Sequence, residues 1–217
     1  YLTQASQSFE ILETLALRDG VLQRRSAHLA RMQASAAHFG FAWQPDAVQQ
    51  TLTQLCQQHP QGAWRVRLLL DATGRLQAQA FALADTPAPV RLQMAASPLL
   101  VADSEFVRHK TTRRAHYDAF TPSDPSVFDT VLWNTRGEIT ECTRGNLALL
   151  LDRRWVTPAL DCGLLPGVGR AHWLAQGRIV EAVVRVSDLP RVQAVAFVNS
   201  LRGWVEACVT GSSPARR

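Results

Sequence analysis

The stretch from Phe9 to Arg24 places the tightest constraint on how this chain can fold. It reads FEILETLALR, then Asp19 and Gly20, then VLQR. An Asp-Gly pair between two apolar runs is typical of a tight turn that joins two antiparallel strands. The sequence therefore predicts a β-hairpin at this point.

The segments after the hairpin predict a first lobe of mixed helices and strands. Ser26 can cap a helix whose apolar residues recur at helical spacing until Gly40 ends it. The segment 98–103 follows Ser97 and shows little periodicity, which indicates a connection between two lobes. The other elements expected before it are a helix over 45–58 and strands over 63–71, 75–83 and 90–96.

Beyond residue 103 the pattern predicts a second lobe with a mostly antiparallel sheet. A helix is expected at 112–120, and LLPGVGRAHWLAQG at 164–177 indicates the start of another. Strands are expected over 127–134, 139–141, 146–151, 179–186, 194–200 and 204–210. The fold class is therefore α+β, with an N-terminal lobe 1–97, a connection 98–103, a C-terminal lobe 104–217 and a cleft between the lobes. The tail 211–217 is expected to be disordered.

The composition describes an ordinary globular protein with a core. Of the 217 residues 47% are hydrophobic and 19% are charged, which excludes a disordered chain. The sequence contains no apolar run long enough for a membrane span, and we expect no secretory signal. Its four cysteines are widely spaced, so we expect reduced thiols and a cytoplasmic location. The chain opens at Tyr1, which leaves open whether it is a fragment of a longer protein.

The charge of the chain favours small anionic ligands over nucleic acid. The net charge is +5 and the pI is near 9.6, but the arginines are scattered and no recognised nucleic-acid motif occurs. Excess positive charge suits phosphates and carboxylates. The six histidines show no metal-ligand spacing, so no metal site is expected.

Lys110 is the only lysine in the chain, while the other 22 basic residues are arginines. A guanidinium stays protonated at any relevant pH, whereas an ε-amine can lose its proton and form a Schiff base with a carbonyl. Lys110 is therefore the candidate catalytic residue. The alternative, that composition bias has left one lysine on a basic helix face, stays open on this residue alone.

A Schiff-base lysine points to pyridoxal 5′-phosphate, which also requires donors for its phosphate and an acid for its ring nitrogen. The turn LLPGVGR runs into a helix, where the amides of Val168 and Gly169 suit an anion. Arg31 can add a fork of donors, and Glu141 can hold the ring nitrogen protonated. Each residue also fits an ordinary turn or a surface position.

Five segments, in this order and at these separations, resemble the class IV aminotransferase family of pyridoxal phosphate enzymes. They are HLARMQASA, HKTTRR, TECTRGNLALL, TPALDCGLLPGVGR and FVNSLRGW. Within the family they look most like the 4-amino-4-deoxychorismate lyases, particularly the form that is the C-terminal part of a fusion with aminodeoxychorismate synthase. The resemblance spans about Phe9 to Trp204. It implies the two-lobed fold type IV, like that of D-amino acid aminotransferase, with the cofactor in the cleft between the lobes, and a homodimer.

The resemblance also implies roles for individual residues. Lys110 would form the Schiff base, Arg31 would bind the cofactor phosphate and Glu141 would face the pyridine nitrogen. The other cofactor-binding residues would be Asn146, Val168, Gly169, Ser200 and Leu201, and the substrate carboxylates would be bound by Arg114 and Arg202. The implied reaction converts 4-amino-4-deoxychorismate to 4-aminobenzoate and pyruvate, a step in folate biosynthesis.

The sequence departs from the family pattern in places. Gly169 stands where many relatives have threonine, which removes a hydroxyl contact to the phosphate, and the first strand reads LET where FET is usual. Ala115 stands where transaminases have a tyrosine, and this difference favours a lyase. The segment TEC at 140–142 also resembles the lyases. Whether Tyr117 reaches the cofactor stays open. Two rivals remain: a branched-chain or D-amino-acid transaminase of the same fold, and a basic, non-catalytic binding domain.

Overall fold

The computed structural model of the chain describes residues 8–210, which form two compact units. Unit 1 comprises the described residues up to Leu83 together with His109–Arg114, and unit 2 comprises Ala84–Arg108 together with the described residues from Ala115 onwards. The tail that we expect to be disordered, 211–217, lies outside the described residues.

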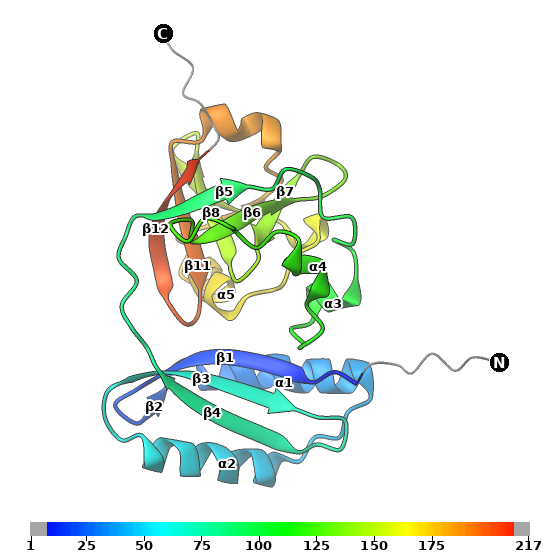
Figure 1. Cartoon of the computed structure of the whole chain (residues 1–217), viewed down its shortest axis with the longest axis vertical. Coiled ribbons are helices and arrows are strands. Elements are labelled where there is room, and N and C mark those ends of the chain that lie inside the picture. The colour runs from blue at the N-terminus through cyan, green and yellow to red at the C-terminus, as the bar shows by residue number, and fades with distance from the viewer. Residues whose placement is uncertain (1–7, 211–217) are drawn as a thin grey trace, which may run out of the picture. The chain divides into compact units, whose positions relative to one another are not determined.

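Unit 1 is a four-stranded antiparallel sheet with two helices on one face (Figure 1). The predicted hairpin is confirmed, with Asp19 and Gly20 both at positive φ in its turn. The order is β2-β1-β3-β4, made of β1 (Ile11–Arg18), β2 (Val21–Leu22), β3 (Ala63–Leu70) and β4 (Leu76–Ala82), and the helices are α1 (Arg25–Phe39) and α2 (Pro45–Gln58). Both helices were predicted, and Gly40 ends α1 as expected. The prediction that Ser26 caps α1 is wrong. The helix begins at Arg25, and the residue before it, Arg24, forms no side-chain cap.

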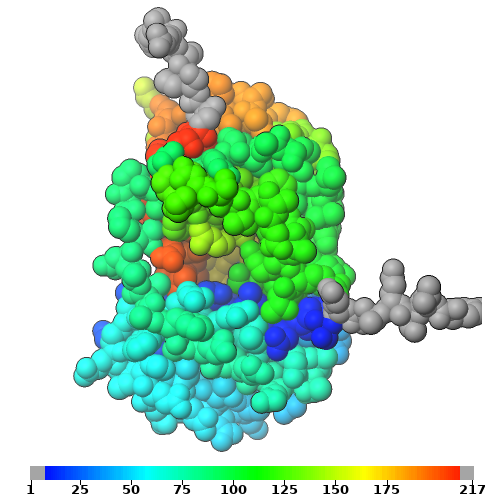
Figure 2. Space-filling view, viewed as in Figure 1, coloured from blue at the N-terminus to red at the C-terminus, as the bar shows by residue number. Residues whose placement is uncertain are grey.

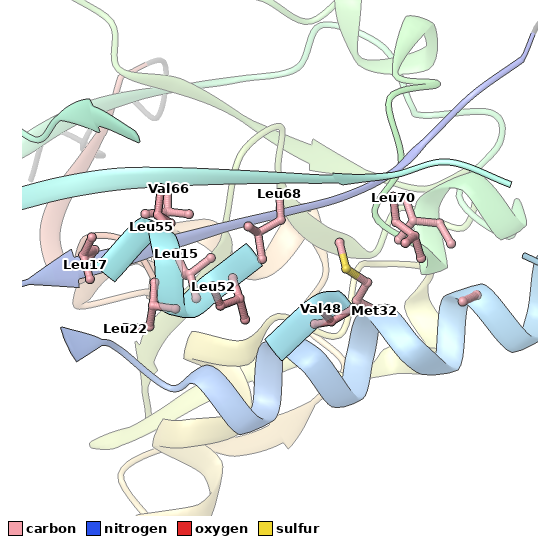
Figure 3. Close-up of a cluster of buried hydrophobic side chains, with 12 residues drawn as sticks. Leu15, Leu17, Leu22, Met32, Val48, Leu52, Leu55, Val66, Leu68 and Leu70 are labelled. Atoms are coloured by element: carbon pink, nitrogen blue, oxygen red, sulfur yellow. The ribbon is translucent and has the colours of Figure 1, made fainter. Parts of the chain in front are cut away.

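The core of unit 1 lies between the sheet and its two helices (Figure 3). Because side chains alternate along a strand, every second residue of β1 and β3 faces the helices. The buried cluster consists of Ile11, Leu15, Leu17, Leu22, Met32, Ala36, Val48, Leu52, Leu55, Val66, Leu68 and Leu70. Glu13 stands on the same face of β1 as Ile11 and Leu15, opposite Leu68 of β3. The other side of α2 is exposed and forms part of the surface of unit 1, light blue to cyan in Figure 2.

Unit 2 is built on an eight-stranded sheet in the order β10-β9-β8-β11-β12-β5-β6-β7. The strands are β5 (Val90–Met94), β6 (Asp129–Trp133), β7 (Ile139–Cys142), β8 (Asn146–Leu151), β9 (Arg154–Pro158), β10 (Val180–Ala182), β11 (Ala194–Asn199) and β12 (Gly203–Thr210). The helices are α3 (Glu105–Arg108), α4 (Ala115–Asp118) and α5 (Val168–Ala175), with 3-10 turns η1 (Leu160–Cys162) and η2 (Val186–Arg191). Four neighbouring pairs are antiparallel and three are parallel, so the sheet is mixed.

The boundaries between the units differ from the ones we expected at 98–103. β5, expected in the N-terminal lobe, pairs with β12 and β6 and so belongs to unit 2. His109–Arg114, expected in the C-terminal lobe, belongs to unit 1, because Thr111 forms a bridge with Ile11 at the N-terminal end of β1. Hydrogen bonding between segments far apart in the chain decides both boundaries.

Some local predictions for unit 2 also differ from the structure. The helix expected over 112–120 is reduced to α4, since Thr112 donates its amide to the Glu10 carbonyl instead of entering a helix. The strand expected over 179–186 is reduced to β10, after which the chain turns into η2. β9 was not predicted at all.

Replacement of Leu68 by alanine should lower the free energy of unfolding by about 2–5 kcal/mol, because a fully buried side chain leaves a cavity. Val21→Ala, at a position with 61% exposure, is the control and should change it by less than about 0.5 kcal/mol. Urea unfolding of the three proteins measures both effects. Equal effects of the two substitutions would contradict the assignment of the core.

Candidate active site

Lys110 lies in the short segment that returns the chain to unit 1. Its carbonyl accepts the amide of Leu12 at 2.9 Å, and the Thr112 amide donates to the Glu10 carbonyl at 2.9 Å. The hydroxyl of Thr112 in turn accepts the Glu10 amide at 2.9 Å. These bonds fix the backbone on both sides of Lys110, whose side chain is half-buried. A residue that holds a cofactor requires such a rigid attachment.

Arg31 lies on α1 and forms a bidentate pair with Glu13 of β1. Its Nε donates to Oε1 and its Nη2 to Oε2, both at 2.7 Å. His28, about one turn earlier on α1, places Nδ1 2.6 Å from the same Oε2. Because an ionised carboxylate only accepts hydrogen bonds, Nδ1 of His28 carries the proton here. Glu13 therefore orients both the guanidinium and the imidazole.

The carboxylate of Glu13 is ionised although its side chain is only 1% exposed. Burial acts to raise the pKa of Glu13. The positive charge of Arg31 and the hydrogen bonds from His28 and Arg31 outweigh burial and lower this pKa from 4.5 to about 2. At neutral pH, Arg31 thus has a fixed counter-ion.

Glu141 stands on β7, and its side chain is buried within unit 2. The Tyr117 hydroxyl donates to Oε1 at 2.8 Å, and the Leu165 amide donates to Oε2 at 3.1 Å. The two oxygens are thus held by two different segments, α4 and the loop before α5. An oriented, buried carboxylate is what a partner for a pyridine nitrogen needs.

Asn146, the first residue of β8, supports the loop before α5. Its Nδ2 donates to the Leu165 carbonyl at 3.0 Å. Gly167, which precedes α5, approaches so closely that a Cβ there would lie 2.0 Å from Asn146 Oδ1. The contacts of Asn146 with the loop suit a supporting role, and its predicted contact with a cofactor stays a prediction.

Gly169 lies where the first turn of α5 meets the turn between β11 and β12. A Cβ at this position would lie 2.5 Å from the Asn199 carbonyl carbon and 2.7 Å from the Ser200 nitrogen. A threonine would therefore displace backbone, which explains the departure from the family pattern. Since the first amides of a helix have no acceptor within it, this start of α5 and the turn with Ser200 and Leu201 suit an anion.

The two arginines predicted to bind substrate lie in different units. The Arg202 guanidinium donates from Nη1 to Thr86 Oγ1 and lies 5.8 Å from the centroid of the Phe128 ring. Its amide donates to Asn199 Oδ1 at 2.8 Å. Arg114 ends the segment that carries Lys110, and its side chain is half-buried. For both arginines the contact with substrate stays a prediction.

The predicted site residues thus fall into two groups. Unit 2 connects Glu141 and Asn146 through Leu165 to the start of α5 and the turn after β11, whereas unit 1 holds Lys110 and Arg31. Sequence reasoning missed the contributions of Glu13, His28 and Tyr117. Glu13 had a readable signal, because a charge stands at an inward-facing position of an apolar strand. The Tyr117–Glu141 pair had none.

Other kinds of site find no support in the part of the chain that the structure describes. Residues 8–210 contain no group of three or more side chains placed to hold a metal ion. Within the same range, no helix has both the length and the apolar character needed to cross a membrane. Cys56, Cys142, Cys162 and Cys208 are all free thiols, as expected.

The stability of the fold should fall as the pH drops below about 4.5, because of Glu13. Its pKa is about 2 in the folded chain and near 4.5 in the unfolded chain, so its contribution is complete above pH 4.5 and is lost as the pH falls toward 2. The contribution is on the order of 3 kcal/mol. Glu13→Gln should flatten this part of the profile of unfolding free energy against pH, while Asp46→Asn, at an exposed position of α2, should not. Equal slopes in wild type and Glu13→Gln would refute the ion pair.

Gly169→Ala should destabilise the chain by roughly 1–3 kcal/mol, since the added Cβ meets backbone atoms. Helix propensity alone predicts the opposite sign, because alanine is favoured over glycine by about 1 kcal/mol. Ala171→Gly, at an exposed position of the same helix, measures that propensity difference. A stabilising effect of Gly169→Ala in urea unfolding would contradict the close approach.

Comparison with known proteins gives the family. The family described as "Amino-transferase class IV" matches residues 10–208. The Schizosaccharomyces pombe protein "Putative aminodeoxychorismate lyase" is 30% identical over 195 residues, which cover 86% of this chain and 84% of that protein.

Solved structures share the fold over nearly the whole chain. A "Putative amino-acid aminotransferase" from Mesorhizobium loti has a TM-score of 0.86 and 36% identity, covering 93% of this chain and 100% of that one. The 4-amino-4-deoxychorismate lyase of Pseudomonas aeruginosa has a TM-score of 0.75 and 20% identity, covering 96% of this chain and 88% of that one. The predicted α+β fold of type IV is confirmed. The chain belongs to the class IV aminotransferase family.

Proposed function

We propose that this chain is a pyridoxal phosphate-dependent lyase that converts 4-amino-4-deoxychorismate to 4-aminobenzoate and pyruvate. The observation that carries the proposal is the continuity of the site in unit 2. The Leu165 amide binds Glu141, and α5 begins three residues later at Val168, beside Ser200. Three residues span at most about 11 Å, which supports the proposal that Glu141 and the first amides of α5 serve the ring nitrogen and the phosphate of one small cofactor.

The residues present fit pyridoxal phosphate, which enzymes of this family use. When bound, the cofactor supplies an electron sink for a carbanion next to the substrate nitrogen. Glu141 would supply the negative charge that keeps the ring nitrogen protonated. Lys110 would hold the aldehyde carbon. The phosphate would be held by Arg31 and by the backbone around Val168, Gly169, Ser200 and Leu201.

The residues of the chain can perform the proton transfer that the lyase reaction needs. A proton must leave the ring carbon that bears the amine, and the ether C–O bond to the enolpyruvyl group must break. Lys110 has the only side-chain amine in the chain, so we assign its Nζ as the base that takes the proton. Arg114 and Arg202 would bind the two substrate carboxylates. The electrons released form the aromatic ring, and the enolpyruvyl group leaves as pyruvate.

A transaminase is the second candidate, because the Mesorhizobium loti protein that is 36% identical is named an aminotransferase. Two observations favour the lyase. Ala115 stands where the resemblance places the tyrosine of transaminases, and the Schizosaccharomyces pombe relative is named a lyase. Membership of an enzyme family argues against a non-catalytic binding domain.

The partners and the location belong to the same proposal. We propose that the active form is a homodimer in the cytoplasm, acting on a small anionic substrate, without nucleic acid or membrane. We also propose that the chain is joined to or works with aminodeoxychorismate synthase. Sedimentation of the protein loaded with cofactor tests the dimer.

Incubation of the purified chain with pyridoxal phosphate, followed by borohydride reduction, should attach the cofactor to Lys110. Peptide mapping identifies the site, and the sequence leaves no second lysine to confuse it. Lys110→Arg keeps the positive charge but not the amine, so it is the matched control and should yield no adduct on residue 110. Absence of an adduct on the wild-type lysine would refute the proposed cofactor chemistry.

Pyruvate release from 4-amino-4-deoxychorismate without any 2-oxo acid then separates the two candidates. The lyase needs no acceptor, so we expect pyruvate in stoichiometric amount with 4-aminobenzoate, and none with Lys110→Arg. If turnover instead requires a 2-oxo acid and an amino acid, the chain is a transaminase.

A further inference from the structure

Tyr117 is one of only two tyrosines in the chain, and its phenol has a specific partner. Its side chain is 6% exposed, and its hydroxyl donates to Glu141 Oε1 at 2.8 Å. A hydrogen bond to an ionised carboxylate is about twice as strong as one between neutral groups. A hydroxyl in this position favours the ionised form of the Glu141 carboxyl over the neutral form.

The ring of Tyr117 is held by an apolar cluster in unit 2. The cluster consists of Ala95, Leu99, Ala102, Val107 and Leu132, with Phe120 and Trp133 packed against it. The Phe120 amide also donates to the Tyr117 carbonyl at 3.0 Å, which anchors the backbone of α4. Because close packing restricts rotation of the ring, the core of unit 2 sets the position of the hydroxyl.

The other oxygen of Glu141 is held from a different direction. The Leu165 amide, in the loop that opens α5, donates to Oε2 at 3.1 Å. Because donors from two separate segments hold the two oxygens, the plane of the carboxyl group is defined.

We propose that Tyr117 is a positioning residue for Glu141, whose carboxylate it keeps ionised and oriented to accept the N–H of a pyridine ring. The inference rests on the proposed function. Loss of the hydroxyl leaves the ring packing intact but removes a donor from a buried anion. The carboxyl then takes a proton or turns, and in either case it no longer holds the ring nitrogen protonated.

Binding of pyridoxal phosphate and of its 1-deaza analogue, which lacks the ring nitrogen, tests this role. In Tyr117→Phe the Kd for pyridoxal phosphate should rise about tenfold, the loss of one hydrogen bond to a charged group. The Kd for the analogue should be unchanged, because it makes no bond to Glu141. A merely structural role of Tyr117 would weaken both ligands alike.

Thr157→Val is the matched control for loss of a buried hydroxyl in unit 2. The Thr157 hydroxyl donates to the Leu147 carbonyl at 2.7 Å, and valine has nearly the same shape. We expect this variant to keep the wild-type ratio of the two dissociation constants. If wild type prefers pyridoxal phosphate to the analogue and Tyr117→Phe keeps the same ratio of dissociation constants, the role of Tyr117 is overturned and the proposed function is not. Failure of wild type to bind pyridoxal phosphate would overturn the proposed function together with this role.

A second measurement tests the hydrogen bond without any cofactor. In a Tyr1→Phe background, Tyr117 is the only tyrosine, so tyrosinate absorbance of the apoprotein reports its ionisation alone. The negative charge of Glu141 disfavours a phenolate beside it. Glu141→Gln should therefore shift the titration midpoint to lower pH, whereas Glu138→Gln, on a carboxylate bound to Asn134 and Arg136, should not. An unchanged midpoint in Glu141→Gln would overturn the pairing.

Discussion

Carboxyl groups buried among apolar side chains are the constraint on which the rest of the structure depends. A buried charge without partners costs several kcal/mol, so each carboxylate dictates what surrounds it. Glu13 is matched in unit 1 by the cation of Arg31 and by His28, and these contacts tie α1 to β1. Glu141 is held in unit 2 by the Tyr117 hydroxyl and the Leu165 amide. These donors come from two different segments of unit 2, α4 and the loop before α5, so the position of the carboxyl group depends on both.

The elements that could be predicted from the sequence are those that depend on local pattern. The Asp-Gly turn requires positive φ angles, and helical spacing followed by Gly40 marks α1, so both were found. The boundaries of the units depend instead on strand pairing across long separations, as when Val90 pairs with Ala207. An apolar run such as 179–186 is typical of a strand. Only the residues that pair with a neighbouring strand become part of the sheet, and in this run they are the residues of β10.

The candidate site divides in the same way. Lys110, Arg31 and Glu141 stand in motifs, so they could be named from the order and spacing of short segments. From the sequence, Gly169 could be interpreted only as the loss of the threonine hydroxyl that many relatives have. The structure adds the reason, because the backbone of Asn199 leaves no room for a side chain. Tyr117 precedes Glu141 by 24 residues, and their contact depends on the packing of α4, which no pattern along the chain encodes.

The polypeptide passes between the two units at three points, after Leu83, after Arg108 and after Arg114. Neither unit is therefore a continuous length of chain. A fragment that ends at Leu83 would lack the segment His109–Arg114, which bonds to the N-terminal end of β1. A fragment that begins at Ala84 would contain this segment but would lack β1. Recombination at a single junction thus cannot exchange one whole unit between relatives. The segment around Lys110 belongs to unit 1 but lies in the sequence between two parts of unit 2, so it must be inherited together with both units.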